Sequence, residues 1–142
     1  MSARTRDRLD TARLGAAVAA LNRSTRREIR LPLGASTIAA LVTVEAEGPI
    51  RLGDLARHEG VAAATLSRIV AVLDDEGYVV RTPDEHDRRS SWLEISDEGR
   101  ALLDGVRREH ARVMAERAGR LTADQAQQLA DALEAIEALA RD

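Results

Sequence analysis

The sequence predicts a mainly α-helical protein that carries one small two-stranded β-hairpin. Ala and Leu, both strong helix formers, dominate the apolar residues, whereas Phe is absent and Trp and Tyr occur once each. Apolar residues recur at helical spacing in six separate segments. Between residues 78 and 95, two short β-branched and aromatic runs instead flank a polar centre. The predicted order is therefore four helices, a hairpin and two helices.

The first two helices are expected at residues 5–27 and 35–45. An apolar stripe marks the first of them: Leu14, Ala17, Val18 and Leu21. Pro32 separates the two helices, because proline disfavours helical conformation at the residue before it. Ser36 is a candidate N-cap of the second helix, and Gly48 and Pro49 end it.

Two further helices, at 51–58 and 62–76, are joined by the tight connection Glu59-Gly60-Val61. A short helix, a glycine-containing turn and a longer helix are typical of a helix-turn-helix. Strands at 78–82 and 92–95 follow, after Gly77, a candidate helix-ending glycine. This order predicts a winged helix-turn-helix, in which the second helix enters the major groove of DNA and the hairpin tip reaches the minor groove or backbone.

The last two helices are predicted at residues 96–120 and from Thr122 onwards. Ser96 caps the first of them and is followed by two acids, which favour a helix N-terminus. Thr122 and Gln125 have the spacing of a capping box. The final helix carries the stripe Leu129, Leu133, Ile136 and Ala140. Because a core of aliphatic residues is thin, we expect the Leu129–Ile136 stripe to be buried against a second copy of the chain.

The helix at 62–76 has the composition of a recognition helix. Its N-terminal half contains Thr65, Ser67 and Arg68 and no acid, whereas three acids lie at its other end. The three alanines at its start would let the helix approach the groove floor closely. The same residues fit an ordinary amphipathic core helix with a polar outer face equally well.

The predicted hairpin tip, residues 83–91, is rich in charge. An Arg at such a tip suits the negative potential of the minor groove, and a carboxylate two residues away can hold the guanidinium in a fixed direction. The alternative interpretation is a solvated charged turn. A divalent metal bound by residues 84–87 is a third interpretation, disfavoured because adjacent side chains rarely converge on one ion.

Charge and motifs restrict the other function classes. The net charge is −3, but all 21 basic residues are Arg, and residues 1–30 hold eight of them against three acids. With no Cys, disulfides and thiolate metal sites are excluded. The three histidines are widely separated, and no nucleophile motif or glycine-rich phosphate loop occurs. We therefore expect no catalytic site, no cofactor and no metal. With no apolar run of about 20 residues and no hydrophobic signal-peptide core at the N-terminus, we expect a cytoplasmic protein without a membrane partner.

A family resemblance adds to this interpretation. Residues 61–70, followed by Leu73, Gly77 and Arg81, resemble the recognition helix and first wing strand of the MarR family. The wing of that family reads D-x-R-D-x-R, then a strand, a Thr or Ser, two polar residues and Gly. The matching residues here are Asp84, Glu85, His86, Asp87, Arg88 and Arg89, then Leu93, Ile95, Ser96 and Gly99. The resemblance covers nearly the whole chain.

Two positions depart from the family pattern. His86 stands where the first Arg of the wing motif is usual, which would weaken or retune the contacts of the wing. Ala62 stands where a Ser or Asp usually caps the recognition helix. That change removes a cap that commonly contributes about 1 kcal/mol.

The resemblance implies a single domain over residues 1–142, with a DNA-binding lobe at about 34–95 and dimerisation helices at about 5–30 and 96–142. It implies a homodimeric regulator, which we expect to be a repressor, on a pseudo-palindromic operator in double-stranded DNA. A small-molecule effector is a further implied partner. A winged-helix protein-interaction module without DNA binding, or a small enzyme, are the alternatives.

The resemblance also assigns the residues that contact DNA. By motif position, Arg89 enters the minor groove, Asp87 orients it, and Arg88 meets phosphate. The recognition-helix contact positions are occupied by Ala64, Thr65, Ser67 and Arg68.

Overall fold

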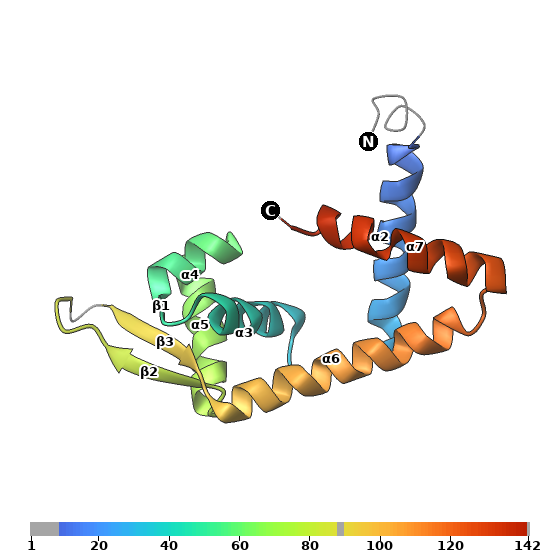
Figure 1. The fold of residues 1–142 in the computed structure, drawn as a ribbon. Coiled ribbons are helices and arrows are strands. Elements are labelled where there is room, and N and C mark those ends of the chain that lie inside the picture. The colour runs from blue at the N-terminus through green and yellow to red at the C-terminus, as the bar shows by residue number, and fades with distance from the viewer. Residues whose placement is uncertain (1–8, 88–89, 142) are drawn as a thin grey trace. The chain divides into compact units, whose positions relative to one another are not determined.

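The computed structural model describes residues 9–87 and 90–141 (Figure 1). The described residues form six helices and three short strands: α2 (Thr11–Glu28), α3 (Ala35–Glu47), β1 (Ile50–Arg51), α4 (Leu52–Glu59), α5 (Ala63–Asp75), β2 (Val79–Pro83), β3 (Ser91–Ile95), α6 (Asp97–Ala118) and α7 (Ala123–Leu139). The predicted mainly α class, with a helix-turn-helix followed by a wing, is confirmed.

The chain divides into two compact units. One spans residues 31–108, and the other contains α2, the C-terminal part of α6 from residue 109, and α7. The expected boundaries of the DNA-binding lobe and of the dimerisation helices stay predictions, because compactness does not show which unit binds DNA or a second copy.

The sheet of the unit 31–108 has three antiparallel strands in the order β1-β3-β2. Val79 of β2 pairs with Ile95, and Pro83 pairs with Ser91 at the other end of the hairpin. The expected two-stranded hairpin is therefore extended by β1, in which Arg51 pairs with Trp92 of β3. Sequence analysis placed Arg51 in the following helix, because a two-residue strand is too short to show an alternating pattern.

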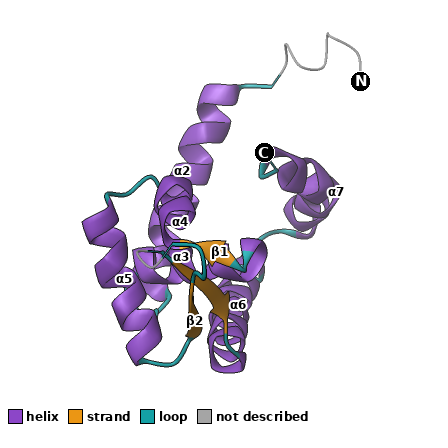
Figure 2. Cartoon of the chain, turned by 90° about the vertical axis from the view of Figure 1, so that its left-hand side faces the viewer, coloured by secondary structure: helices purple, strands orange, loops and turns teal. Residues whose placement is uncertain are grey.

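Helices α3, α4 and α5 lie around the small sheet (Figure 2). Aliphatic side chains from these helices and the sheet, together with Leu103 of α6, form the core of this unit. The predicted stripe of α5 is buried in full: Leu66, Ile69, Val70 and Leu73. Each such side chain contributes roughly 1.5–3 kcal/mol of burial. The opposite face of α5 is thereby left to solvent.

Two glycines end the helices of the helix-turn-helix. Gly60 ends α4 with a positive φ of 64°, and Val61 N–H donates to Ala56 O at 3.1 Å. Gly77, with a φ of 74°, follows α5 as expected. The prediction of Ser36 as an N-cap is wrong: α3 begins at Ala35 as expected, but Gly34, two residues before Ser36, takes the cap position without a side-chain cap bond.

The second unit leaves two apolar stripes exposed within the single chain. In α7 no described residue is buried, and Leu129, Leu133 and Ile136 keep 48%, 53% and 43% of their surface. In α2, Val18 and Leu21 are also exposed. The helix N-terminus of α7 has the predicted capping box, in which Thr122 and Gln125 bond reciprocally. Arg117 of α6 joins this unit internally through Ser24 Oγ (2.9 Å) and an ion pair with Glu28 at the end of α2.

Candidate nucleic-acid interface

The four predicted contact residues of α5 all lie on its exposed face. Ala64, Thr65, Ser67 and Arg68 are exposed, and their spacing places them together on the N-terminal half of the helix. The buried stripe of α5 fixes this orientation because the same helix cannot turn without exposing four core residues. The interpretation of α5 as an ordinary core helix with a polar face is compatible with this placement, so burial alone does not assign the contacts.

Hydrogen-bonding capacity on this face is limited. Ser67 Oγ donates its hydrogen to Ala63 O at 2.9 Å, which leaves the hydroxyl as an acceptor toward any ligand. Arg68 forms no ion pair with another residue that the structure describes, so its guanidinium is available. Arg68 is thus the one long donor on this half of α5.

The N-terminus of α5 lacks a side-chain cap. Ala62 is the cap residue, and no acid occurs in the first turn. The first N–H groups of a helix without a cap need an outside acceptor, and the positive end of the helix dipole favours an anion there. This end of α5 can therefore accept a phosphate group of a nucleic acid backbone.

Asp84, at the base of the wing, is buried rather than solvated. Its side chain keeps 2% of its surface, and Oδ1 accepts the backbone N–H of His86 at 2.9 Å. Oδ2 lies 2.7 Å from Nη2 of Arg51 in an ion pair. The bond from His86, aided by Arg51, holds the pKa of Asp84 below its ordinary value although burial opposes this.

The solvated-turn interpretation is therefore wrong for Asp84, whose side chain is buried and paired with Arg51. A turn pattern could have suggested this role, because the carboxylate of an Asp commonly accepts the backbone N–H of the residue two positions later. Its partner Arg51, 33 residues away in the chain, carried no signal of this kind.

The described part of the wing is closed by backbone bonds. Asp84 N–H donates to Ser90 O at 3.1 Å, and Ser90 N–H donates to Asp87 O at 2.8 Å. Asp87 is exposed. Arg88 and Arg89, which were expected to meet phosphate and the minor groove, lie outside the described residues. The expected pairing of Asp87 with Arg89 stays a prediction.

Arg51 also contacts the tryptophan of the chain. Its guanidinium carbon lies 4.7 Å from the centroid of the Trp92 ring, within the range of a cation–π contact. Arg51 thus connects β1 with two points of the wing, Asp84 and Trp92. Sequence analysis did not single out this residue.

Comparison with known proteins assigns the family. A model of the MarR family matches residues 34–91. An uncharacterized HTH-type transcriptional regulator of Mycobacterium bovis is 33% identical over 127 residues, which cover 89% of each chain. A similar regulator of Mycobacterium leprae is 33% identical over 124 residues, or 87% of each chain.

The chain belongs to the MarR family. It is a DNA-binding transcriptional regulator of the winged helix-turn-helix class. The relatives are named as regulators rather than as enzymes.

Three solved structures share the fold. A putative transcriptional regulator of Pseudomonas aeruginosa superposes with a TM-score of 0.77 at 25% identity, covering 93% of this chain and 94% of that one. A transcriptional regulator of Thermotoga maritima gives 0.74 at 23% identity, with 90% and 94% covered. The YusO protein of Bacillus subtilis gives 0.72 at 20% identity, with 99% and 100% covered. The last two matches show the fold alone.

In this MarR-family chain, one hydroxyl joins the turn after α5 to the first turn of α6. Ser96 Oγ donates to Gly77 O at 2.6 Å, and it accepts the N–H of Gly99 at 3.0 Å. The predicted cap role of Ser96 is confirmed. Gly99 is required beside it, because a Cβ there would lie 2.2 Å from Tyr78 O.

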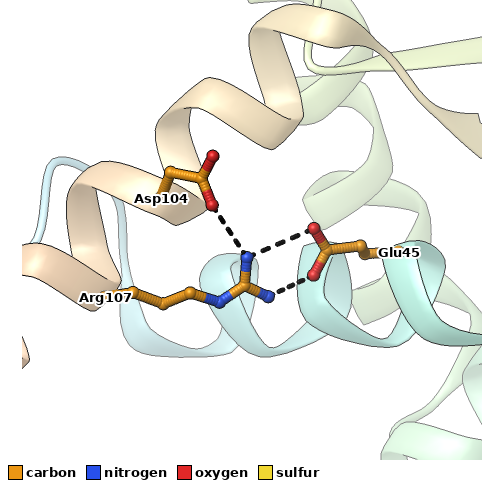
Figure 3. A network of polar contacts seen from close by, with 3 residues as sticks. All are labelled: Glu45, Asp104 and Arg107. Carbon is orange, nitrogen blue, oxygen red and sulfur yellow. Dashed lines mark hydrogen bonds and ion pairs between the residues drawn. The ribbon is translucent and has the colours of Figure 1, made fainter.

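A second connection joins the middle of α6 to α3 (Figure 3). The guanidinium of Arg107 faces both carboxylate oxygens of Glu45 and also contacts Asp104 Oδ1 at 3.1 Å. These hydrogen bonds raise the pKa of Arg107 above its ordinary value. The contact holds α6 against α3, which packs against α5 in the core of the same unit.

Within residues 9–87 and 90–141, no cluster of His, Asp and Glu has the arrangement of a metal site. None of the helices described has both the length and the apolar character needed to cross a membrane.

Proposed function

We propose that this MarR-family chain acts as a homodimer that binds a pseudo-palindromic operator and represses transcription. The observation that carries the proposal is the exposed, acid-free N-terminal half of α5, in the same unit as a wing anchored by Arg51. A helix of this kind can enter the major groove while the wing reaches the adjacent minor groove. A MepR mutant of Staphylococcus aureus, with a TM-score of 0.67 at 13% identity, was solved bound to an oligodeoxyribonucleotide.

The contact residues of this proposal are those that the family resemblance assigns. Arg89 enters the minor groove, Asp87 orients it, and Arg88 contacts phosphate. The face of α5 that meets the bases consists of Ala64, Thr65, Ser67 and Arg68.

The dimer is supported by the exposed apolar stripes of the second unit. Large aliphatic side chains of α2 and α7 remain about half exposed within the described chain. Contiguous apolar surface on a small protein commonly marks an interface. A second copy offers the same stripes, as a two-fold interface requires.

Release by a small-molecule effector is part of the proposal. The structure of the PcaV regulator of Streptomyces coelicolor, with a TM-score of 0.59 at 19% identity, contains its natural ligand. Because this chain has no Phe, aliphatic side chains and Arg would dominate an effector site, and ring stacking would be scarce.

Selection of bound sequences from random duplex DNA tests DNA binding and symmetry together. We expect a near-palindrome with half-sites about one helical turn, ~34 Å, apart. A salt titration of the selected duplex should give a linear fall of log affinity with log salt. Selected sites without inverted symmetry, at protein concentrations that preserve the dimer, would contradict the dimeric model. Failure to select any sequence would favour a protein-interaction module.

A further inference from the structure

The wing contains a buried charge whose partner lies outside the wing. Asp84 is almost fully buried, and its Oδ2 receives no hydrogen bond from the described residues in favourable geometry. What faces Oδ2 is the guanidinium of Arg51, at 2.7 Å. A carboxylate withdrawn from water is costly unless a cation compensates it. The conformation of the wing base therefore depends on Arg51.

Arg51 occupies the junction between the helix-turn-helix and the sheet. It is the second residue of β1 and also the cap residue at the start of α4. In the sheet it pairs with Trp92, and its side chain covers the same ring. Arg51 thus lies at the start of the first helix of the helix-turn-helix and contacts both sides of the wing, Asp84 just after β2 and Trp92 in β3.

We propose that Arg51 is a positioning residue that sets the direction of the wing relative to the recognition helix through Asp84. The Oδ1 of Asp84 accepts the N–H of His86, and the Asp84 N–H donates to Ser90, so both sides of the tip start from this residue. Because Arg51 fixes the position of Asp84, it also fixes the base of the wing tip. This inference rests on the proposed DNA binding and names a residue outside the family's wing motif.

The chemistry at this point favours Arg over Lys. A guanidinium is planar, so it can lie over an indole ring while an edge N–H faces a carboxylate. An ammonium could pair with Asp84 but would not cover Trp92 in the same way. The side chain of Arg51 remains 45% exposed, so a direct phosphate contact is the rival role that the experiment has to exclude.

The test compares variants that change charge in opposite directions. Arg51→Ala removes a positive charge, and Asp84→Asn removes a negative charge while retaining an oxygen for the His86 N–H. If Arg51 positions the wing, both variants should bind the selected duplex about tenfold more weakly. Binding to random duplex should change little, because it does not depend on an aligned wing. The double variant should resemble either single variant, and Arg51→Lys should recover part of the loss.

Two further measurements separate positioning from general stability. Urea unfolding identifies any variant that is not folded at the binding temperature. The emission and acrylamide quenching of Trp92 should change in Arg51→Ala and less in Arg51→Lys, because the ring loses its cover. If Arg51→Ala does not fold, the double variant Arg51→Ala/Asp84→Asn replaces it in the comparison. The double variant should fold because it no longer buries an unpaired carboxylate.

Arg57→Ala provides a matched control for charge. Arg57 is 81% exposed and pairs with Asp54 of its own helix, so this variant measures what the loss of one Arg from the same unit does. Tighter binding by Asp84→Asn, additive losses in the double variant, or equal losses on selected and random duplex would overturn the positioning role. If the wild-type protein binds no duplex at all, the proposed function fails and the inference fails with it.

Discussion

In the proposed function, base recognition by α5 would depend mainly on one long side chain. Arg68 is exposed, whereas Ser67 has given its hydrogen to Ala63 O, and Ala64 offers only a methyl group. Methyl groups of Ala and Thr can contact the methyl group of thymine, but they do not distinguish donors from acceptors. If α5 contacts the bases as proposed, we expect readout by hydrogen bonds to be sparse and DNA shape to carry much of the specificity.

The proposal predicts that Arg68 contacts a guanine, and replacing each guanine of the selected half-site in turn by 7-deazaguanine tests this. The base analogue removes the N7 acceptor, so wild-type binding should weaken by about 1–3 kcal/mol. The affinity of Arg68→Ala for the duplex should not change with the same replacement. The measurement is a band-shift titration, with 7-deazaguanine outside the half-sites as control. Equal weakening of both proteins would show that Arg68 does not read this base.

The wing is tested by Arg89→Ala and Asp87→Ala. Loss of an Arg from the minor groove should weaken specific binding by about 1–3 kcal/mol. Asp87→Ala should also weaken it, although removal of a negative charge near DNA is favourable by simple electrostatics. The double variant should lose less than the sum of the singles, as fluorescence titration with Trp92 can measure. Tighter binding by Asp87→Ala at low salt, where screening is weakest, would show that Asp87 does not orient Arg89 and acts only as a surface charge.

Single residues differ in how far sequence analysis could place them. The exposed residues of α5 were predictable, because helical periodicity fixes which positions face the core. The burial of Asp84 was not, because it depends on Arg51 across a strand pairing that no local pattern reveals. The tip residues Arg88 and Arg89 stay assigned by motif position.

At the scale of elements, the order and type of the helices and of the wing followed from periodicity and turn residues. Gly60 and Gly77 both adopt positive φ, as helix-ending glycines do. β1 was missed because two residues have no detectable period, and Ser36 lies inside the first turn of α3 because Gly34 takes the cap position. Boundaries are set by such tertiary details more than by propensity.

The uncapped start of α5 gives a prediction at this scale. Ala62→Ser should raise the free energy of unfolding by about 0.5–1 kcal/mol, because a hydroxyl at the cap can accept a first-turn N–H. Urea denaturation measures the difference. Ala63→Ser, one residue inside the helix, is the matched control and should give no gain. An unchanged midpoint for Ala62→Ser would mean that the first turn already has its acceptors.

At the scale of the whole molecule, the two units differ in how well the chain covers its own apolar surface. The unit 31–108 buries a continuous aliphatic core, whereas α7 buries no described residue. Sequence analysis could predict the α7 stripe, but the partner that covers it cannot be read from one chain. The homodimer accounts for the stripe within the proposed function.

Truncation after Arg120 should therefore produce monomer or aggregate. The change removes Leu129, Leu133 and Ile136, whose burial in the dimer would supply interface free energy. Sedimentation measures the outcome. In the full chain, Leu133→Asp should weaken the dimer, and Gln128→Asp, which adds the same charge outside the stripe, should not. A stable folded dimer of the truncated chain would place the interface elsewhere.

The bonds of Ser96 give the junction between the wing and α6 the properties of a stiff mechanical coupling. One hydroxyl bonds both Gly77, two residues after the end of α5, and the first turn of α6, and Gly99 allows the backbones to approach closely. With two hydrogen bonds and a close backbone contact, this junction leaves little room for the two segments to rotate independently. A twist of α6 about its own axis would thus be passed to α5 as torque, and the angle at which the recognition helix meets the groove would change with it.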